Sequence, residues 1–447
     1  MNLAKLSWKY IVDRPLNTFL NVLLFGFGIA IILVLLLVSR QMEDALTKNA
    51  KGINLVVAAK GSPLQIILCN IYHVDFPTGN IALEEAIELS KNSLIKRSIP
   101  LALGDSYRDY RIVGTTHAYA DLYQVTPASG QLWGKHAEAV IGANVALTTG
   151  MKVGDEFATE HGMQSGGIAH DDHGMTVVGI LERSGTVVDN LILTSVESVW
   201  EAHEEHDDHE AHEDHNEAHD DHDHDKQHDD HEHKEHHHDP HHDHEHSEDE
   251  MVTALGLTYH PHELKDKEIT SLIVQYAGPM GAVRLPRMIN EETNMQSASP
   301  AFETARLFTL IGTGVEVING FAYLIIFIAG LSIFISLYNS LKQRTYDLAI
   351  MRAMGASSRF LFLHVIVESM IISFLGGVFG LILAHVAVGV IDDFFIPVES
   401  QVRLSALLFL KSEFIILALS FGVGIFAAVI PAISAYKTDI SKTLARG

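Results

Sequence analysis

Four long apolar runs dominate the pattern of hydrophobic and polar positions along the chain. The first extends from Phe19 to Ser39, the second from near Val315 to Tyr338, and the last two cover residues 361–390 and 413–435. A helix needs about 20 consecutive apolar residues to cross a bilayer. The first run lacks a small-residue cleavage site, which favours an uncleaved anchor over a removable signal peptide. We therefore predict four transmembrane helices, at residues 18–40, 311–338, 361–391 and 412–436.

Between the first two apolar runs the pattern changes to short β-branched segments. "INLVVAAKG", "YRIVGTT", "AEAVIGANVA", "MTVVGILE" and "NLILTSVESVW" are separated by Gly and Asn, which is typical of strands, and "MVTALGLTYH" and "EITSLIVQYA" continue the pattern. Residues 83–92, "LEEAIELSKN", have the spacing of an amphipathic helix. The predicted fold class is a membrane α-helical protein with a large α+β extracytoplasmic domain between helices 1 and 2, formed by residues 41–200 and 251–310.

The distribution of positive charge predicts the orientation of the helices, because Lys and Arg are enriched in short cytoplasmic segments. Basic residues precede the first run, lie between the second and third, and follow the fourth: Lys5, Lys9 and Arg14; Lys342, Arg344, Arg352 and Arg359; Lys437, Lys442 and Arg446. The loop at 392–411 has Asp392, Asp393 and Glu399 against Arg403 and Lys411. We expect an amphipathic entry helix at 1–17, a loop at 339–360 and a tail at 437–447 in the cytoplasm, so both termini are cytoplasmic.

Composition agrees with a membrane protein, since 47% of the residues are hydrophobic and the mean hydropathy is positive. The net charge of −25 is local: residues 201–250 contain 23 acidic residues and two lysines, so the rest of the chain is nearly neutral. We expect no nucleic-acid partner. The one cysteine, Cys69, excludes an intramolecular disulfide framework and a Cys-based zinc finger. We expect it to be buried.

The segment at 201–250 is the most unusual part of the chain, because 18 of the 28 histidines lie in it. It lacks the apolar residues needed for a core, so we expect it to be disordered without a ligand. The candidate metal ligands are its histidines: His203, His206, His209, His212, His215, His219, His222, His224, His228, His231, His233, His236, His237, His238, His241, His242, His244 and His246.

Imidazole binds zinc, copper and nickel well, and carboxylates can complete the coordination shell. The spacing begins at three, continues as His-x-His pairs and ends in a triplet. No single spacing persists, so we predict several exchangeable sites. Zn²⁺ is the expected metal, with Cu²⁺ or Ni²⁺ as alternatives, and the competing interpretation is a soluble charged spacer without a specific role. A weaker candidate cluster, predicted on a hairpin loop, comprises His161, His170, Asp171 and His173. The segment "YHVD" at 72–75 is interpreted as ordinary structural sequence.

Both ends of the chain resemble one transporter family. "LSWKYIVDRPLNTFLNVLLFGFGIA" is similar to the entry helix and first span of MacB/FtsX-type ABC transporter permeases. "RTYDLAIMRAMGASSRFLFLHVIVES", residues 344–369, resembles the family's "R-x-x-E-I-x-x-L-R-A-x-G-A-s" loop, and "AVIPAISAYKTDISKTLARG" resembles its C-terminal motif. Asp347 replaces the family's frequent Glu, and Ile440-Ser441 replaces its usual Pro. The histidine tract lies outside the general family pattern, so this resemblance does not explain it.

The resemblance implies that the loop between spans two and three is a coupling helix that contacts an ATPase. Leu348, Met351 and Met354 give it an apolar stripe at helical spacing, Gly355 suits its C-terminus, and Ser357 or Ser358 can cap the next helix. Contact with lipid headgroups is the alternative. The candidate coupling residues are Arg344, Asp347, Leu348, Met351, Arg352, Met354 and Gly355. The chain has no G-x-x-x-x-G-K-[ST] loop, so we expect it to bind no nucleotide and another polypeptide to supply the ATPase.

The predicted function is that of a non-enzymatic transmembrane subunit of an ABC transporter in a bacterial inner membrane. Expected partners are a separate ATPase, a second copy of the chain, membrane lipid and a periplasmic protein, and the histidine tract suggests zinc uptake or homeostasis. Two alternatives remain: export or release of a lipoprotein, peptide or drug, and an FtsX-like scaffold that controls a periplasmic partner. In the third span, Glu368, His364 and His385 are ionisable and therefore candidates for a substrate or ion pathway.

Overall fold

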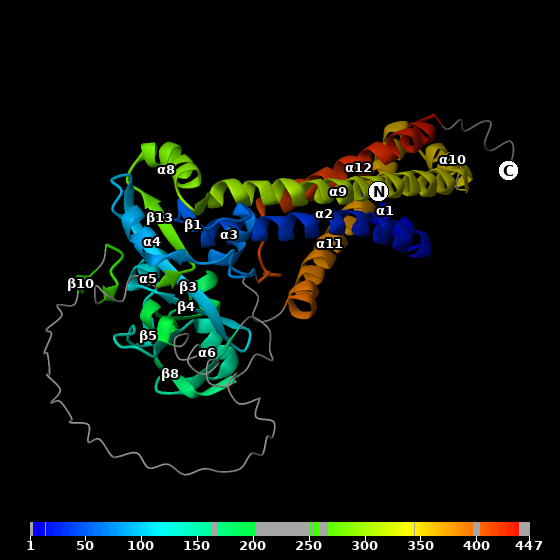
Figure 1. The fold of residues 1–447 in the computed structure, drawn as a ribbon. Coiled ribbons are helices and arrows are strands. Elements are labelled where there is room, and N and C mark those ends of the chain that lie inside the picture. Colours follow the sequence, from blue (N-terminus) through cyan, green and yellow to red (C-terminus); the bar gives the residue numbers. More distant parts are fainter. Residues whose placement is uncertain are drawn as a thin grey trace, which may run out of the picture. The chain divides into compact units, whose positions relative to one another are not determined.

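A computed structural model describes residues 3–13, 15–161, 169–201, 251–252, 254–259, 267–343, 345–396 and 403–437. The contacts divide the chain into two compact units (Figure 1). Residues 1–48 and 304–447 form one, which we call the membrane unit, and residues 49–303 form the other, which we call the α+β unit.

The membrane unit consists of helices. Four of them are long and apolar enough to cross a membrane, as the sequence predicted. The helices are α1 (Leu3–Val12), α2 (Pro15–Asn49), α9 (Pro300–Gln343), α10 (Thr345–Ala353), α11 (Ser358–Phe395) and α12 (Lys411–Tyr436).

The long helices continue beyond the apolar runs that predicted them. For example, α9 has 44 residues and begins at Pro300, ahead of the predicted start at residue 311. At 1.5 Å per residue it is about 66 Å long, roughly twice the thickness of a hydrocarbon core. Hydropathy identifies only the part of a helix that suits lipid. Polar residues that also favour helices, such as Glu303 and Arg306, extend α9 without any apolar signal.

Close helix crossings hold the membrane unit together. A Cβ added to Gly380 of α11 would lie only 2.6 Å from the backbone oxygen of Gly26 in α2, so this crossing depends on the absence of a side chain. About three turns away along α11, the Ser369 hydroxyl donates to the carbonyl of Gly424 in α12 at 2.6 Å. Small residues and interhelical hydrogen bonds are the usual means of packing helices in lipid, where the hydrophobic effect cannot drive association. The large apolar side chains Phe25, Leu33 and Leu361 are fully buried around these crossings.

The α+β unit combines one large sheet with short helices (Figure 1). Its strands are β1 (Leu55–Ala59), β2 (Ile81–Ala82), β3 (Ile95–Tyr107), β4 (Tyr110–Thr115), β5 (Pro127–Gly130), β6 (Glu138–Ile141), β7 (Glu156–His161), β8 (Ala169–Leu181), β9 (Leu191–Ser195), β10 (Met251–Val252), β11 (Thr258–Tyr259), β12 (Glu268–Ile269), β13 (Ser271–Tyr276) and β14 (Met295–Ala298). Its helices are α3 (Pro63–Asn70), α4 (Leu83–Ser90), α5 (His117–Tyr123), α6 (Ala143–Thr149), α8 (Pro279–Glu292) and a 3-10 turn at Val187–Asn190.

Strand β3 belongs to two parts of the sheet. Its first half pairs with β13, and the order continues through β1 to β14. Its second half pairs with β4, and the order continues through β9 and β6 to β8. Strand β7 then pairs with both β8 and β3, which closes the second part into a ring. The register of β3 with β4 shifts between Leu103 and Ser106, where Gly104 stands, and this irregularity accompanies the change from one part to the other.

Two hydrophobic cores correspond to these two parts. One packs Leu55, Leu272 and Leu285 between the β14–β1–β13–β3 strands and helices α4 and α8, and the other fills the ring with Ile112 and Val177. The predicted strands and the predicted helix at 83–92 are confirmed. Strand β3 was not predicted, because Pro100, Gly104 and the Lys96-Arg97-Ser98 run interrupt its alternation.

Candidate functional site

The histidine tract from His203 to His246 lies outside the described residues, so its predicted metal sites stay a prediction. Within the described part of the chain, no group of three or more His, Cys, Asp or Glu side chains is placed to hold a metal ion.

The second predicted histidine cluster occupies strands. His161 is the last residue of β7, and His170, Asp171 and His173 lie in β8, which pairs antiparallel with β7. The prediction that these residues lie on a hairpin loop is therefore wrong, because both strands extend further than their apolar residues indicated. Residues 162–168, which connect the two strands, are outside the described part.

The predicted coupling helix is α10, and both of its predicted end signals are present. Gly355 has φ +102°, which favours glycine, and its N–H donates to the carbonyl of Arg352 at 3.0 Å. The N–H of Ala356 donates to the carbonyl of Met351, so the two bonds form a Schellman motif. Ser357 then caps α11, because its hydroxyl accepts the N–H of Phe360. The α10–α11 turn is thus specified by its sequence.

The apolar face that α10 exposes differs from the predicted one. Met351 is only 9% exposed and packs into the core of the membrane unit, so it cannot belong to an outward stripe. The exposed apolar side chains are Tyr346, Ile350 and Met354, which are four residues apart and share one face. Met354 is 75% exposed. The side chains of Arg344, Asp347 and Leu348 are outside the described part.

A buried polar contact ties α1 to the beginning of α11. His364 Nδ1 lies 2.8 Å from the Ser7 hydroxyl, and both residues are buried. The prediction that His364 is a candidate for a substrate or ion pathway stays a prediction. Its contact with Ser7 connects the entry helix to the same end of α11 that carries the α10 turn.

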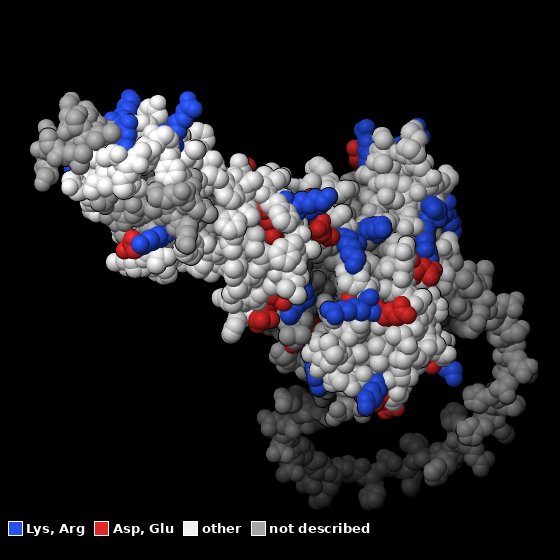
Figure 2. All heavy atoms as spheres, turned by 180° about the vertical axis from the view of Figure 1, so that it is seen from behind, with Lys and Arg blue, Asp and Glu red and all other residues white. Residues whose placement is uncertain are grey.

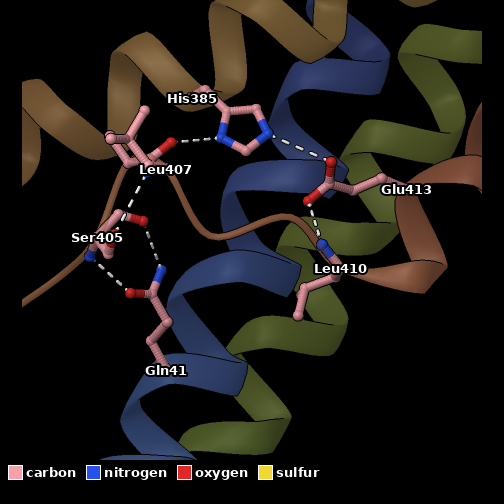
Figure 3. Close-up of polar contacts among 7 residues, drawn as sticks. Gln41, His385, Ser405, Leu407, Leu410 and Glu413 are labelled. Carbon is pink, nitrogen blue, oxygen red and sulfur yellow. Dashed lines mark hydrogen bonds and ion pairs between the residues drawn. The ribbon is translucent and has the colours of Figure 1, made fainter.

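The opposite end of α11 holds the loop that leads to α12 (Figure 3). Gln41 of α2 accepts the N–H of Ser405 at 2.6 Å, and its amide donates to the Ser405 carbonyl at 3.3 Å. His385 of α11 donates from Nδ1 to the Ala406 carbonyl at 2.6 Å. These bonds connect the loop to two different helices. We call this arrangement the loop clamp.

Two carboxylates complete the loop clamp. Glu413, 2% exposed in the first turn of α12, accepts the N–H of Leu410 at 2.9 Å and lies 3.3 Å from His385 Nε2 (Figure 3). Asp392 of α11 accepts from Arg403 and from the N–H of Leu404, both at 2.8 Å. A buried carboxylate must be paired, so each of these acids needs the loop in this position.

A cluster of buried polar side chains lies in the α+β unit beneath α3. Arg111 of β4 donates to the Asp75 carbonyl at 2.9 Å and to Cys69 Sγ at 3.4 Å. Cys69 is buried, as predicted. His73, also buried and at φ +52°, has Nε2 3.1 Å from the Tyr119 hydroxyl. Burial and the nearby Arg111 guanidinium hold the pKa of His73 well below its ordinary value, so the ring is neutral.

This cluster supports a short exposed segment, residues 74–78, which we call the Phe76 loop. Gln65 donates to the Phe76 carbonyl at 3.2 Å, and the Thr78 hydroxyl donates to the Ala59 carbonyl at 2.9 Å. Although its backbone is held at several points, the loop leaves Val74 and Phe76 more than half exposed. Exposed apolar side chains on a fixed backbone are typical of protein contact sites.

Two family models match the chain in an order that agrees with these two units. A MacB-like periplasmic core domain matches residues 18–214, and an FtsX-like permease C-terminal domain matches residues 319–440. The first match contains α2 and most of the α+β unit, and the second contains the α10 turn, α11 and α12. The chain belongs to the MacB/FtsX-type ABC transporter permeases.

Two solved structures similar to this permease are extracytoplasmic regions of transporters. The periplasmic region of MacB from Actinobacillus actinomycetemcomitans is 10% identical, with a TM-score of 0.31, over 59% of this chain and 97% of that one. The extracellular domain of the noncanonic ABC-type transporter YknZ from Gram-positive bacteria is also 10% identical, with a TM-score of 0.28, over 55% and 100%. No curated protein sequence matches the permease.

Membership of the family means that this permease is the transmembrane subunit and that the ATPase is a separate subunit. It is a multi-pass membrane protein, and its α+β unit is of the MacB periplasmic type. Neither family model covers residues 215–318, so most of the histidine tract lies outside both.

The neutral state of His73 predicts how the stability of the permease depends on pH. The folded pKa is lowered, so the unfolded chain binds this proton first as the pH falls. The stability that the neutral His73 ring contributes is fully present above the pKa of histidine in the unfolded chain, about 6.5. As the pH falls below that value, the free energy of unfolding decreases by about 1.4 kcal/mol per pH unit.

We expect His73→Asn, which tolerates positive φ, to be less stable at pH 7.5 and less sensitive to acid. Thermal unfolding at pH 7.5 and 5.5, followed through Trp133 and Trp200, measures the difference. The tract histidines are present in both proteins and cancel. An equal loss of stability on acidification in both would contradict the assignment of His73.

Proposed function

We propose that this permease carries motion from a separate ATPase, bound at α10, to the α+β unit, in a system for zinc uptake or homeostasis. The termini and α10 lie in the cytoplasm of a bacterium, the α+β unit lies outside the inner membrane, and two copies form the working assembly. The positive charges near both termini and α10 support this orientation. Figure 2 shows Lys and Arg side chains at the α10 end of the membrane unit and a long uncharged stretch beside them.

The exposed face of α10 is the observation that best supports an ATPase contact. Tyr346, Ile350 and Met354 form an apolar face on a short helix, a common form of helix-in-groove recognition. The Schellman motif and the Ser357 cap fix the angle at which α10 meets α11. A displacement of α10 by the bound ATPase is therefore transmitted directly to α11.

The route beyond α10 is one continuous helix. From Ser358 to Phe395, α11 has 38 residues and is about 57 Å long. The loop clamp connects its far end to α2 and α12 through Gln41 and Glu413. Because α2 leads directly into the α+β unit, a displacement of the clamp reaches a helix that carries that unit.

We expect Met354→Asp to weaken ATPase binding without unfolding the permease. An aspartate in the centre of an apolar contact costs the energy of desolvating a charge, so the affinity should fall about 10-fold to 100-fold. Leu407→Asp, at an equally exposed apolar position in the loop clamp, is the matched control. Co-purification with the ATPase measures the effect, and equal binding by both variants would contradict the proposal.

The zinc role depends on the composition of residues 203–246. Eighteen imidazoles provide ligands that zinc prefers, and the surrounding carboxylates attract divalent cations before they are ligated. Ligation neutralises repelling charges, so metal should make the segment more compact. A metal-dependent change of this kind within the external domain gives the system a means of collecting zinc or responding to its level.

Replacing all tract histidines by Ser, with every acid retained, should abolish high-affinity Zn²⁺ binding measured by calorimetry. Growth under zinc limitation or zinc excess should fall to the level of a strain without residues 203–246. The retained acids control for a spacer or charge effect. Normal growth of both strains in both conditions would remove the zinc role and leave the permease function intact.

The Phe76 loop favours a second candidate, the scaffold that controls an external protein. Val74 and Phe76 present an apolar contact on a backbone held by Arg111 and Gln65. Such a contact suits a folded partner protein and needs no transported substrate. Under this function the ATPase still drives α10, and the α+β unit acts on the partner bound at the loop.

A further inference from the structure

An open groove lies between the first turns of α11 and the last turn of α12. It is formed by Arg359, Phe362 and Leu363 from α11 and by Ile433 and Tyr436 from α12, and its volume is about 440 Å³. Its walls are apolar and aromatic side chains, and Arg359 supplies the charge. Neither family membership nor the ATPase contact at α10 accounts for this groove.

The length of α12 places the groove at the level of lipid headgroups. Its 26 residues, about 39 Å, extend from Lys411 to Tyr436, and Lys437 follows. A hydrocarbon core is about 30 Å thick, so the last turn of α12 extends beyond the acyl chains into the interfacial region. Tyr436 in that turn suits an interface, where its ring is apolar and its hydroxyl is hydrated. Arg359 lines the same groove and therefore lies at the same level.

We propose that this groove binds one anionic phospholipid of the leaflet that faces α10. The acyl chain lies along Phe362, Leu363 and Ile433, and the phosphate is bound by Arg359. Among the described residues, no carboxylate pairs with Arg359 or with Lys437 at the end of α12. A guanidinium binds phosphate through two parallel hydrogen bonds, and Lys437 adds a second positive charge.

Charge distinguishes the lipid from the other candidate occupants. The following segment of the chain, residues 438–447, has one acidic side chain, Asp439, against Lys442 and Arg446, so it offers little negative charge to Arg359 and Lys437. A purely apolar protein segment would leave Arg359 without an anion. An anionic lipid satisfies both the apolar walls and the charge. This inference depends on the membrane span alone, and it holds whether or not the protein handles zinc.

The test is native mass spectrometry of the full-length protein in detergent. Dioleoyl phosphatidylglycerol and dioleoyl phosphatidylcholine are the probes, because their acyl chains are identical. We expect one tightly held phosphatidylglycerol and about ten-fold less phosphatidylcholine. Excess inorganic phosphate should not displace the lipid, since it lacks the acyl chain. Displacement by phosphate would show a simple anion site and overturn the proposal.

Variants identify the groove as the binding site. Arg359→Gln should lower phosphatidylglycerol binding about ten-fold, and Arg359→Lys should retain part of it. Lys411→Gln makes the same change of charge at the opposite end of α12 and should have no effect. Equal binding by the wild type and Arg359→Gln, or equal losses in Arg359→Gln and Lys411→Gln, would overturn the proposal. So would phosphatidylglycerol binding only after removal of residues 438–447, because the tail would then occupy the groove.

Discussion

The close approach of α11 to its neighbours is the contact on which the membrane unit depends. At Gly380 and Gly26 the backbones of α11 and α2 meet with no room for a side chain, and about three turns away along α11 the Ser369 hydroxyl bonds the backbone of α12 at Gly424. In lipid the hydrophobic effect does not hold helices together, so such crossings provide much of the packing energy. They also make α11 hard to displace alone. A movement at one end of α11 must move α2 and α12 or break the crossings.

Polar contacts connect each of the two ends of α11 to different parts of the membrane unit. At the α10 end, Ser7 meets His364, and the turn after α10 is fixed by Gly355 and the Ser357 cap. At the other end, the loop clamp joins α11 to α2 and α12 through buried carboxylates and amides. The groove between α11 and α12 lies beside the α10 turn. A lipid bound there would stabilise the contact between these two helices.

Much of this organisation follows from local sequence. The four spans, the strands with β-branched runs such as β1, β4 and β9, the stop at Gly355 and a serine cap at 357 or 358 each depend on neighbouring residues, and these were predicted. The loop clamp could not be predicted from the sequence, because Gln41 and Ser405 are 364 positions apart. A single glutamine in a helix does not indicate which distant residue it contacts. The face of α10 was predicted incorrectly for a related reason. A methionine at helical spacing is equally suited to a core or a contact surface, and only the tertiary packing places Met351 inside and Ile350 outside. The composition of the tract from His203 to His246 predicts metal binding, but it does not predict which histidines bind one ion together.

The most direct measurement is of nucleotide-dependent motion at the loop clamp when one α11 crossing is loosened. A spin label at Leu407, which is exposed, would report this motion in a Cys69→Ser background with the ATPase bound. Gly380→Ala forces α2 away from α11, whereas Gly422→Ala meets nothing within 4 Å and controls for the change in helix propensity. The spectrum should change with nucleotide in the wild type and in Gly422→Ala, and should stay constant in Gly380→Ala although the ATPase still binds. An unchanged response in Gly380→Ala would show that motion reaches the outer loop by another route.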